Sequence, residues 1–364
     1  MFLITLSTVF VALYVTLIRI FKLGWKSIAV FQAEELSPEE KINVSVVVSC
    51  KNEEKSLPHL ISALKNQTHQ DFELVLINDH STDRTEEIMR ESLSFFQSAI
   101  YLQAEGCGKK RAIAEAISRS SGDLIITTDA DCIPVRTWIE TIVKFQTKYP
   151  SHLIIGPVKL SDKRSLFARL QQFEFTSLVA SGAGAAGAQM PIMCNAANMA
   201  FDKNAWLASK QDLKPEEQSG DDVFLLQSIK KRGGIIRFLR SEKAFVSTEP
   251  AENLRAFIHQ RRRWAGKSTA YTDWHSIAVA CIVFGLCSVL LLLLALAFSN
   301  ALYLYFFLFF FLLKYWMDER FLNEVSDFYS LKSTAFYSFC LSLVYPFYIV
   351  FTAISALFFK PRKW

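Results

Sequence analysis

The chain has 364 residues, 51% of them hydrophobic, and its mean hydropathy is positive. It is too long for one small domain, and the composition indicates a part embedded in a membrane. Because the net charge is only +5 and acidic and basic residues are interspersed, nucleic acid is not expected as a partner. The seven cysteines form no CxxC pair, which argues for a reducing compartment and against a disulfide or zinc framework.

The first apolar stretch runs from Phe2 to Ile18 and is followed by Arg19, Lys22 and Lys26. About 17 to 20 apolar residues can cross a ~30 Å hydrocarbon core. Because the positive charges follow the stretch, it predicts a retained anchor at residues 1–22 and not a cleaved signal peptide. The positive-inside rule then places the next domain in the cytoplasm, so we expect an integral protein of the bacterial inner membrane. Residues 23–42 are expected to form an acidic linker.

Strand and helix patterns alternate from residue 44 to about residue 160. Apolar, β-branched runs predict strands at 44–48, 72–77 and 124–126, and helices are expected at 85–96 and 109–119. Short buried strands separated by helices predict an α/β fold with a mostly parallel sheet. In such a sheet, ligands bind beyond the carboxyl ends of the strands.

Polar residues follow each of the three predicted strands. They are Ser49 and Glu53 after the first strand, Asp79 and Asp83 after the second, and Asp129 and Asp131 after the third. Any one group is also what a turn or a helix cap requires. Three acidic strand ends at one sheet edge, however, predict a shared site.

The third of these turns, 127–132, predicts a metal site. Carboxylates two residues apart on an extended segment point the same way, so Asp129 and Asp131 can reach one cation. Hard oxygen ligands suit Mg²⁺ or Mn²⁺, and such an ion typically holds a diphosphate. Lys109 is unfavourable for the dipole at the start of a helix, but it is well placed if an anion binds there.

Residues 177–190 are rich in Ala, Gly and Ser and show no periodicity. We expect a mobile loop or a surface that approaches the substrate closely, and an inert linker is the alternative. Asn195 and Asn198 follow and offer amides for sugar hydroxyls. Asp221 and Asp222 then precede an apolar helix; one Asp suffices as a cap, so the second is available for chemistry.

A dense cationic stretch, which contains Gln260, Arg261, Arg263 and Trp264, lies in an expected amphipathic interface segment at 256–275. A basic collar at the membrane surface would also explain it. Apolar stretches at 277–298, 301–316 and 336–359 predict about three spans within 276–364, with a charged loop at 318–327. Four crossings in all would put the basic tail opposite the catalytic domain. Either one segment is then re-entrant or interfacial, or the charge rule is overridden.

Seven short stretches resemble, in order, the motifs of the membrane-bound family-2 glycosyltransferases with a GT-A catalytic domain. They are 48–54, 78–83, 108–112, 129–131, 194–200, 220–222 and 260–264. The last contains the Q-X-X-R-W pattern, and 129–131 is the D-X-D pattern. The resemblance implies a GT-A domain at 43–255 flanked by transmembrane helices.

The resemblance also implies roles for the predicted site residues. Glu53 and Asp79 would contact the nucleoside, and Asp129 and Asp131 would bind the diphosphate and the metal. The other substrate-binding residues would be Ser49, Asp83, Lys109, Asn195, Asn198, Gln260, Arg261, Arg263 and Trp264. The catalytic residues would be Asp221 and Asp222, with Asp222 as the base that activates the acceptor; the family usually has Glu-Asp where this chain has Asp221–Asp222.

Together these features predict an inverting transferase that moves a sugar from a nucleotide-sugar, with UDP favoured, to a lipid or glycan acceptor at the membrane. A metal with Arg261 and Arg263 would neutralise the leaving diphosphate, while a carboxylate on the opposite face takes the acceptor proton. About three C-terminal spans favour single addition over a processive polysaccharide synthase. The alternatives are that synthase, a non-catalytic nucleotide-sugar-binding membrane scaffold, and a nucleotidyltransferase.

Overall fold

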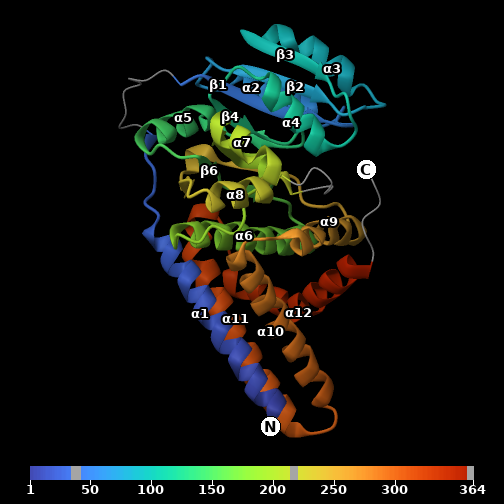
Figure 1. Cartoon of the computed structure of the whole chain (residues 1–364). Helices are drawn as coiled ribbons and strands as arrows, with labels where there is room; N and C mark the ends of the chain where they lie inside the picture. The colour runs from blue at the N-terminus through green and yellow to red at the C-terminus, as the bar shows by residue number, and fades with distance from the viewer. Residues whose placement is uncertain (34–41, 214–219, 359–364) are drawn as a thin grey trace. The chain divides into compact units, whose positions relative to one another are not determined.

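The computed structural model describes residues 1–33, 42–213 and 220–358, and its internal contacts divide the chain into two compact units (Figure 1). The sheet unit contains Ile28–Ser161 and Met193–Glu249. The helical unit contains Met1–Ser27, Asp162–Ile192 and the described residues 250–358. The domain predicted at 43–255 therefore includes a segment, 162–192, that packs with the terminal helices. The acidic part of the predicted linker and the basic tail lie outside the described residues.

A seven-stranded sheet with the order β3-β2-β1-β4-β8-β6-β9 forms the centre of the sheet unit. β1 is parallel to β2 and β4, β2 is parallel to β3, and β6 is parallel to β9, whereas β8 is antiparallel to both β4 and β6. The strands are β1 (Val44–Cys50), β2 (Glu73–Asn78), β3 (Ser98–Gln103), β4 (Leu124–Thr127), β6 (Leu153–Ile155), β8 (Met199–Asp202) and β9 (Ile236–Phe238). The prediction of a mostly parallel sheet is confirmed. A second sheet has the order β5-β10-β7, formed by β5 (Ile133–Pro134), β10 (Val246–Thr248) and β7 (Val158–Leu160).

The central strand β1 agrees with its sequence pattern. Six of its seven residues are buried, as expected for a parallel strand covered on both faces. β3, at the edge of the sheet, was not predicted; it has no buried residue, and its apolar run 99–102 includes only one β-branched residue. The fully buried three-residue strand β6 was not predicted either.

Helices connect these strands. They are α2 (Leu57–Lys65), α3 (Thr85–Ser92), α4 (Lys109–Arg119), α5 (Trp138–Lys148), α7 (Lys203–Ser209) and α8 (Asp221–Lys231). Short 3₁₀ turns are η2 (Leu93–Phe95), η3 (Ala196–Asn198), η4 (Lys210–Asp212) and η5 (Glu242–Ala244). The predicted helix at 109–119 is confirmed to the residue, and α4 packs against β1 and β2. It therefore begins at the edge where those strands end.

The prediction of a loop at 177–190 is wrong, because most of this segment belongs to helix α6 (Leu166–Gly187) of the helical unit. A Cβ added to Gly24 of α1 (Phe2–Ser27) would lie 1.9 Å from the Gly184 carbonyl oxygen. Small residues thus let the two helix backbones approach closely. Alanine is also the best helix former, so the lack of large side chains did not argue against a helix.

Among the described residues, four helices are long and apolar enough to span a membrane. They are α1, α10 (Trp274–Leu296), α11 (Ala301–Tyr329) and α12 (Thr334–Phe358, of which the span covers Thr334–Ala356). The remaining helices of this unit are α9 (Leu254–Gly266) and the short η6 (Lys267–Ala270). Figure 1 shows α10 and α11 beside α1, and α12 packs against α10 and α11.

The charged loop predicted at 318–327 is not a loop, because α11 continues through it. Asp318 accepts a hydrogen bond from Lys314, one helical turn earlier, at 2.5 Å. It accepts another from the hydroxyl of Tyr14 in α1, also at 2.5 Å. The charges are thus satisfied within the helix packing, which the sequence pattern could not show.

Candidate active site

The loops that follow β1 and β2 are joined by hydrogen bonds at the edge of the sheet. Asn52 and His80 both have a left-handed backbone, with φ of 57° and 58°, which turns each chain sharply after its strand. The Asn52 side chain accepts a hydrogen bond from the N–H of Thr82 at 2.8 Å, and the Asn52 N–H donates to the Ser81 hydroxyl at 3.1 Å. These bonds fix the position of the following residue, Glu53.

Asp83 also links these two loops by hydrogen bonds. One of its carboxylate oxygens accepts from the N–H of Glu54 at 3.2 Å, and the other accepts from the N–H of Thr85 at 3.0 Å and from its hydroxyl at 2.5 Å. Desolvation opposes ionisation, but the hydrogen bonds outweigh it and lower the pKa of Asp83. The described contacts thus give Asp83 a role in loop geometry, and its contact with substrate stays a prediction. Ser49 lies in β1, paired with Ile77 of β2, and is partly exposed.

Asp79 is buried at the end of β2 and fixes the start of helix α4. Its side chain is 2% exposed. One carboxylate oxygen accepts from the N–H of Gly108 at 2.8 Å, and the other lies 4.0 Å from the Lys51 ammonium. Gly108 caps α4 with φ 109°, a conformation that glycine adopts without strain. Asp79 therefore determines the position of Lys109, the residue that follows Gly108.

Lys109 offsets part of the negative charge of the acidic turn after β4. It is the first residue of α4, and its ammonium group donates to Asp129 at 2.5 Å. Desolvation alone would lower the pKa of Lys109, but the carboxylates of Asp129 and Asp221 outweigh this effect and raise it. Lys109 is thus kept charged, and Asp131 acts on it in the same direction.

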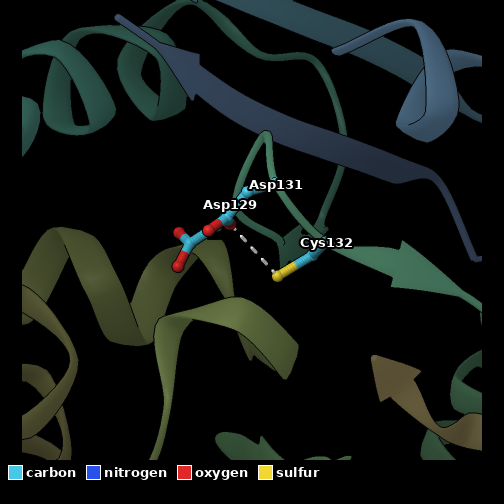
Figure 2. Close-up of side chains that lie close together, drawn as sticks. All are labelled: Asp129, Asp131 and Cys132. Atoms are coloured by element: carbon cyan, nitrogen blue, oxygen red, sulfur yellow. Dashed lines mark hydrogen bonds between the residues drawn. The ribbon is translucent and has the colours of Figure 1, made fainter. Parts of the chain in front are cut away.

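Figure 2 shows the turn after β4, where Asp129, Asp131 and Cys132 lie close together. The possible ligand atoms of these three residues are all within 4.8 Å of one another. The Cys132 thiol is buried and donates to Asp131 at 3.6 Å. Burial, followed by the two neighbouring carboxylates, raises the pKa of this thiol. Sulfur is also a soft ligand, so Cys132 does not suit a hard cation.

The two carboxylates of this turn repel each other. Asp131 is exposed at the surface of the turn, yet the surrounding protein groups remove part of its hydration. Desolvation first, and then the charge of Asp129, raise the pKa of Asp131. A divalent cation bound by both oxygens would remove this repulsion. Asp129 and Asp131 therefore fit Mg²⁺ or Mn²⁺ in donor chemistry.

Glu53 belongs to the same acidic cluster, defined here as Glu53, Asp129 and Asp131. It is partly buried at the end of β1. Desolvation and, next, the charge of Asp131 raise the pKa of Glu53 to about 7. Three acids on two neighbouring strand ends are thus held near one lysine, and an environment of this kind is typical of a functional site.

Asp221 and Asp222 are the first two residues of α8, where the helix dipole favours negative charge. Asp222 is 8% exposed and one of its oxygens accepts from the N–H of Val223 at 2.8 Å. Asp221 is partly exposed, acts electrostatically on Lys109, and lines a cavity of about 470 Å³ together with Thr127. The sheet unit thus brings the predicted residues Glu53, Asp79, Lys109, Asp129, Asp131, Asp221 and Asp222 to one region.

The two asparagines predicted to bind sugar hydroxyls have structural roles. Asn198 is fully buried; its amide donates to the carbonyls of Pro157 and Ala244, each at 2.8 Å, and its oxygen accepts from the Trp138 indole at 2.9 Å. No donor of Asn198 is left for a sugar, so this prediction is corrected. Asn195 is partly exposed and caps η3 through the N–H of Ala197 at 3.0 Å.

The predicted cationic motif lies in the helical unit, on α9. The Arg261 side chain is 4% exposed and forms a two-pronged ion pair with Glu174 of α6, with one bond of 2.9 Å from Nε. Its remaining nitrogen donates to Gln260 at 2.5 Å, and its guanidinium lies 4.2 Å from the centre of the Trp264 ring. Each of its three nitrogens thus donates one bond within the protein, and the contact of Arg261 with the diphosphate stays a prediction. Arg263, on the same helix, is partly exposed.

Sequence reasoning missed Glu174, although one signal was present. The residue stands between Phe173 and Phe175 as a lone acid in an otherwise apolar and amide-bearing stretch. An isolated charge in such a stretch is expected to be paired when it is buried.

The strand order, the acidic cluster and the lysine at a helix start define the class of nucleotide-diphospho-sugar transferases with a GT-A fold. The structure is similar to that of a mannosyltransferase from Pyrobaculum calidifontis, solved with GDP-mannose and Mn²⁺. The similarity covers 98% of this chain and 99% of the other, with a TM-score of 0.61 and 14% sequence identity. At this identity the likeness concerns the fold.

Two sequence families match the chain. Glycosyl transferase family 2 matches residues 45–202, and glycosyl transferase family group 2 matches residues 124–318. The second match covers more than half of the chain, which therefore belongs to the family-2 group of glycosyltransferases.

Curated relatives agree with this assignment over part of their length. The undecaprenyl-phosphate 4-deoxy-4-formamido-L-arabinose transferase of Pectobacterium carotovorum is 30% identical over 159 residues, which are 42% of this chain and 48% of that protein. The transferase of the same name from Proteus mirabilis is 39% identical over 103 residues, 26% of this chain and 31% of that protein. The chain spans at most about half the length of these relatives.

Proposed function

We propose that this protein is an inverting glycosyltransferase that transfers a sugar from a nucleotide-sugar, with UDP favoured, to a membrane-associated lipid or glycan acceptor. The observation that carries the proposal is the acidic cluster of Glu53, Asp129 and Asp131 beside Lys109. Like charges held together at strand ends are costly unless a ligand compensates them. A diphosphate with a divalent cation supplies that compensation.

Asp129 and Asp131 are proposed to hold Mg²⁺ or Mn²⁺, and the ion when bound neutralises charge on the leaving diphosphate. The similar mannosyltransferase was solved with Mn²⁺ and a nucleotide-sugar, which supports this cofactor. Lys109 stands at the N-terminus of α4, so its ammonium and the helix dipole both favour a phosphate group there. Glu53 and Asp79 are proposed to bind the nucleoside.

Asp222 is proposed as the base. It takes the proton of the acceptor hydroxyl while that oxygen attacks the anomeric carbon, and the bond from this carbon to the diphosphate oxygen breaks. Attack from the face opposite the diphosphate inverts the configuration. Among the remaining motif residues, Gln260, Arg263 and Trp264 are proposed to act on the diphosphate and the acceptor.

The four apolar helices support an acceptor that is held in a membrane. The names of the relatives, which specify undecaprenyl phosphate, favour a lipid phosphate as one candidate acceptor. We place the protein in the bacterial inner membrane with the sheet unit in the cytoplasm, where nucleotide-sugars are made available. Single addition is favoured over polymer synthesis, and the relatives' names support this choice.

The proposal is tested with the full chain in lipid nanodiscs. Radiolabelled UDP- and GDP-sugars are offered with Mn²⁺ or with EDTA, together with lipid-phosphate and lipid-hydroxyl acceptors. We expect one lipid-linked product that requires the metal, with an anomeric configuration opposite to that of the donor when determined by NMR. A ladder of product lengths would favour the polysaccharide synthase, and binding without transfer for every donor and acceptor would favour the scaffold.

A further inference from the structure

A buried charge cluster joins three helices of the helical unit, outside the acidic cluster. Glu174 of α6 is 2% exposed, and Arg261 of α9 is 4% exposed. The guanidinium of Arg261 donates to both carboxylate oxygens of Glu174. The Tyr348 hydroxyl of α12 donates to one of the same oxygens at 2.7 Å. Glu174 is therefore the point at which α6, α9 and α12 meet.

Aromatic rings enclose this ion pair. The Arg261 guanidinium lies 4.5 Å from the centre of the Phe257 ring on one turn of α9 and 4.2 Å from that of Trp264 on another. Phe257 in turn lies 5.8 Å from the ring of Tyr348. Rings that stack on a guanidinium fix its plane, so the side chain is held in one orientation.

Arg261 is next to Gln260 and two residues before Arg263 on the same helix. Its third nitrogen donates to Gln260 at 2.5 Å, which orients the first residue of the Q-X-X-R-W pattern. Residues that are fixed on one helix by a buried, two-pronged ion pair cannot rotate independently. The pair thus determines the orientation of Gln260, Arg263 and Trp264 together.

We propose that Glu174 is a positioning residue for the transfer reaction: through its ion pair with Arg261, braced by Tyr348, it holds helix α9 so that Gln260, Arg263 and Trp264 act on the substrates. This inference rests on the proposed function in one respect, the action of the motif on donor and acceptor. The anchoring itself does not depend on which sugar is transferred.

Hydrogen–deuterium exchange tests the anchoring without an activity assay. The full chain in nanodiscs is compared as parent, Glu174→Gln, Tyr348→Phe and Asp162→Asn. Asp162 is the matched control, because it pairs with Arg169 of α6 at 2.9 Å while its side chain is 68% exposed. We expect amide exchange in Leu254–Gly266 to rise about tenfold or more in Glu174→Gln, less in Tyr348→Phe, and not in the control.

Kinetic measurements then distinguish a positioning role of Glu174 from a role in the stability of the protein. Active sites are counted by the stoichiometry of nucleotide binding, and kcat is given per site. We expect Glu174→Gln to lower kcat at least tenfold while the KM for the nucleotide-sugar changes less than threefold, because the nucleoside residues lie in the sheet unit. A merely structural role would reduce the number of binding sites and leave kcat per site unchanged.

The charge-swapped double variant Glu174→Arg/Arg261→Glu and the variant Arg261→Lys complete the test if Glu174→Gln does not fold. The double variant is expected to recover part of the kcat lost in Arg261→Glu alone, and Arg261→Lys to lose kcat because a single ammonium cannot form the two-pronged bond. Unchanged exchange of α9 and unchanged kcat per site in Tyr348→Phe and Arg261→Lys would overturn the inference. If the parent protein transfers no sugar but Glu174→Gln still raises the amide exchange of α9, the proposed function is overturned. The anchoring of α9 by Glu174 is then still supported.

Discussion

The protein contains two charge clusters of opposite character. In the sheet unit, Glu53, Asp129 and Asp131 are like charges held near one lysine, and the pKa values of Glu53 and Asp131 are raised. In the helical unit, Glu174 and Arg261 are opposite charges joined by a two-pronged ion pair, with Tyr348 donating to Glu174 and Gln260 accepting from Arg261. The first cluster is electrostatically unsatisfied and partly open to solvent, whereas the second is satisfied and buried.

This difference indicates what each cluster is for. An unsatisfied group of carboxylates is unfavourable for stability in the absence of a ligand, which is the pattern expected where a cation and a diphosphate bind. A buried pair of opposite charges is compensated without a ligand, and it fixes the helices that supply its members. Neutralising substitutions should therefore have opposite effects on stability at the two places.

The largest expected effect is that of Asp131→Asn on transfer. Loss of one metal-binding carboxylate should lower kcat/KM by about 10³-fold, because the charge on the leaving diphosphate is then poorly neutralised. The same change should raise the melting temperature of the metal-free protein, since it removes the repulsion with Asp129. Activity assays and thermal melts with EDTA measure the two effects.

The matched control for Asp131→Asn is Glu86→Gln, which removes an exposed carboxylate of α3 that pairs with Arg90. It should change neither activity nor melting temperature measurably. A metal-free Asp131→Asn protein that melts lower than the parent would contradict the description of this cluster as unsatisfied.

The next effect is that of Asp222→Asn. If Asp222 removes a proton from an acceptor hydroxyl, kcat should fall by about 10²-fold or more, while nucleotide-sugar binding stays within about threefold of the parent. The measurement combines steady-state kinetics with calorimetric titration of the donor. Transfer at the parent rate would show that Asp222 is not the base. It would also favour a phosphate acceptor, since a phosphate monoester with a second pKa near ~6 is largely ionised already.

Glu174→Gln should have the opposite effect on stability from Asp131→Asn. It leaves Arg261 charged and buried without its partner, which costs about 3 kcal/mol. We expect a fall of several degrees in the melting temperature, measured with the full chain in nanodiscs. The double variant Glu174→Gln/Arg261→Gln should lose less than the single one, because no uncompensated charge remains. If Asp131→Asn and Glu174→Gln changed the melting temperature in the same direction, the two clusters would not differ as described.

The smallest effect concerns Gly220, which begins α8 with φ 98°. Alanine is strained in this left-handed conformation, so Gly220→Ala should lower stability by about 1 kcal/mol and reduce kcat a few-fold by shifting Asp221 and Asp222. Gly266→Ala is the matched control for stability, because Gly266 has a right-handed helical backbone and an added Cβ would meet no atom within 4 Å. It should be neutral or slightly stabilising. Equal melting temperatures for both variants would argue against the backbone constraint.

The sequence predicted those strands and helices whose hydrophobic pattern agrees with their position in the sheet unit. The strands β1, β2 and β4 were predicted from apolar runs, and the helix α4 from its periodicity, because buried central elements carry those patterns. The edge strand β3 was not predicted, because its apolar run 99–102 includes only one β-branched residue. Helix α6 was mistaken for a loop, because its many small residues obscure a pattern that depends on large side chains.

In the candidate site, too, some features followed from the sequence and others did not. The acids that follow strands were predicted correctly in place, because parallel strands bring their carboxyl ends to one edge. Asn198 and Arg261 were predicted to contact substrate from their side-chain chemistry and motif position, whereas the structure shows both bonded within the protein. Glu174 lies 87 residues from its partner, and a pairing over that distance is set by helix packing and not by local sequence.

The most direct test of the metal and diphosphate site is the thermal stabilisation of the full chain by nucleotide-sugars, measured with and without Mn²⁺. We expect a UDP- or GDP-sugar at about 100 times its dissociation constant to stabilise the parent by about 2.7 kcal/mol with Mn²⁺, and far less with EDTA. In Asp131→Asn the difference between the two conditions should disappear. Equal stabilisation of the parent with and without the metal, or the same Mn²⁺ effect in Asp131→Asn, would contradict the assignment of Asp129 and Asp131 as the ligands.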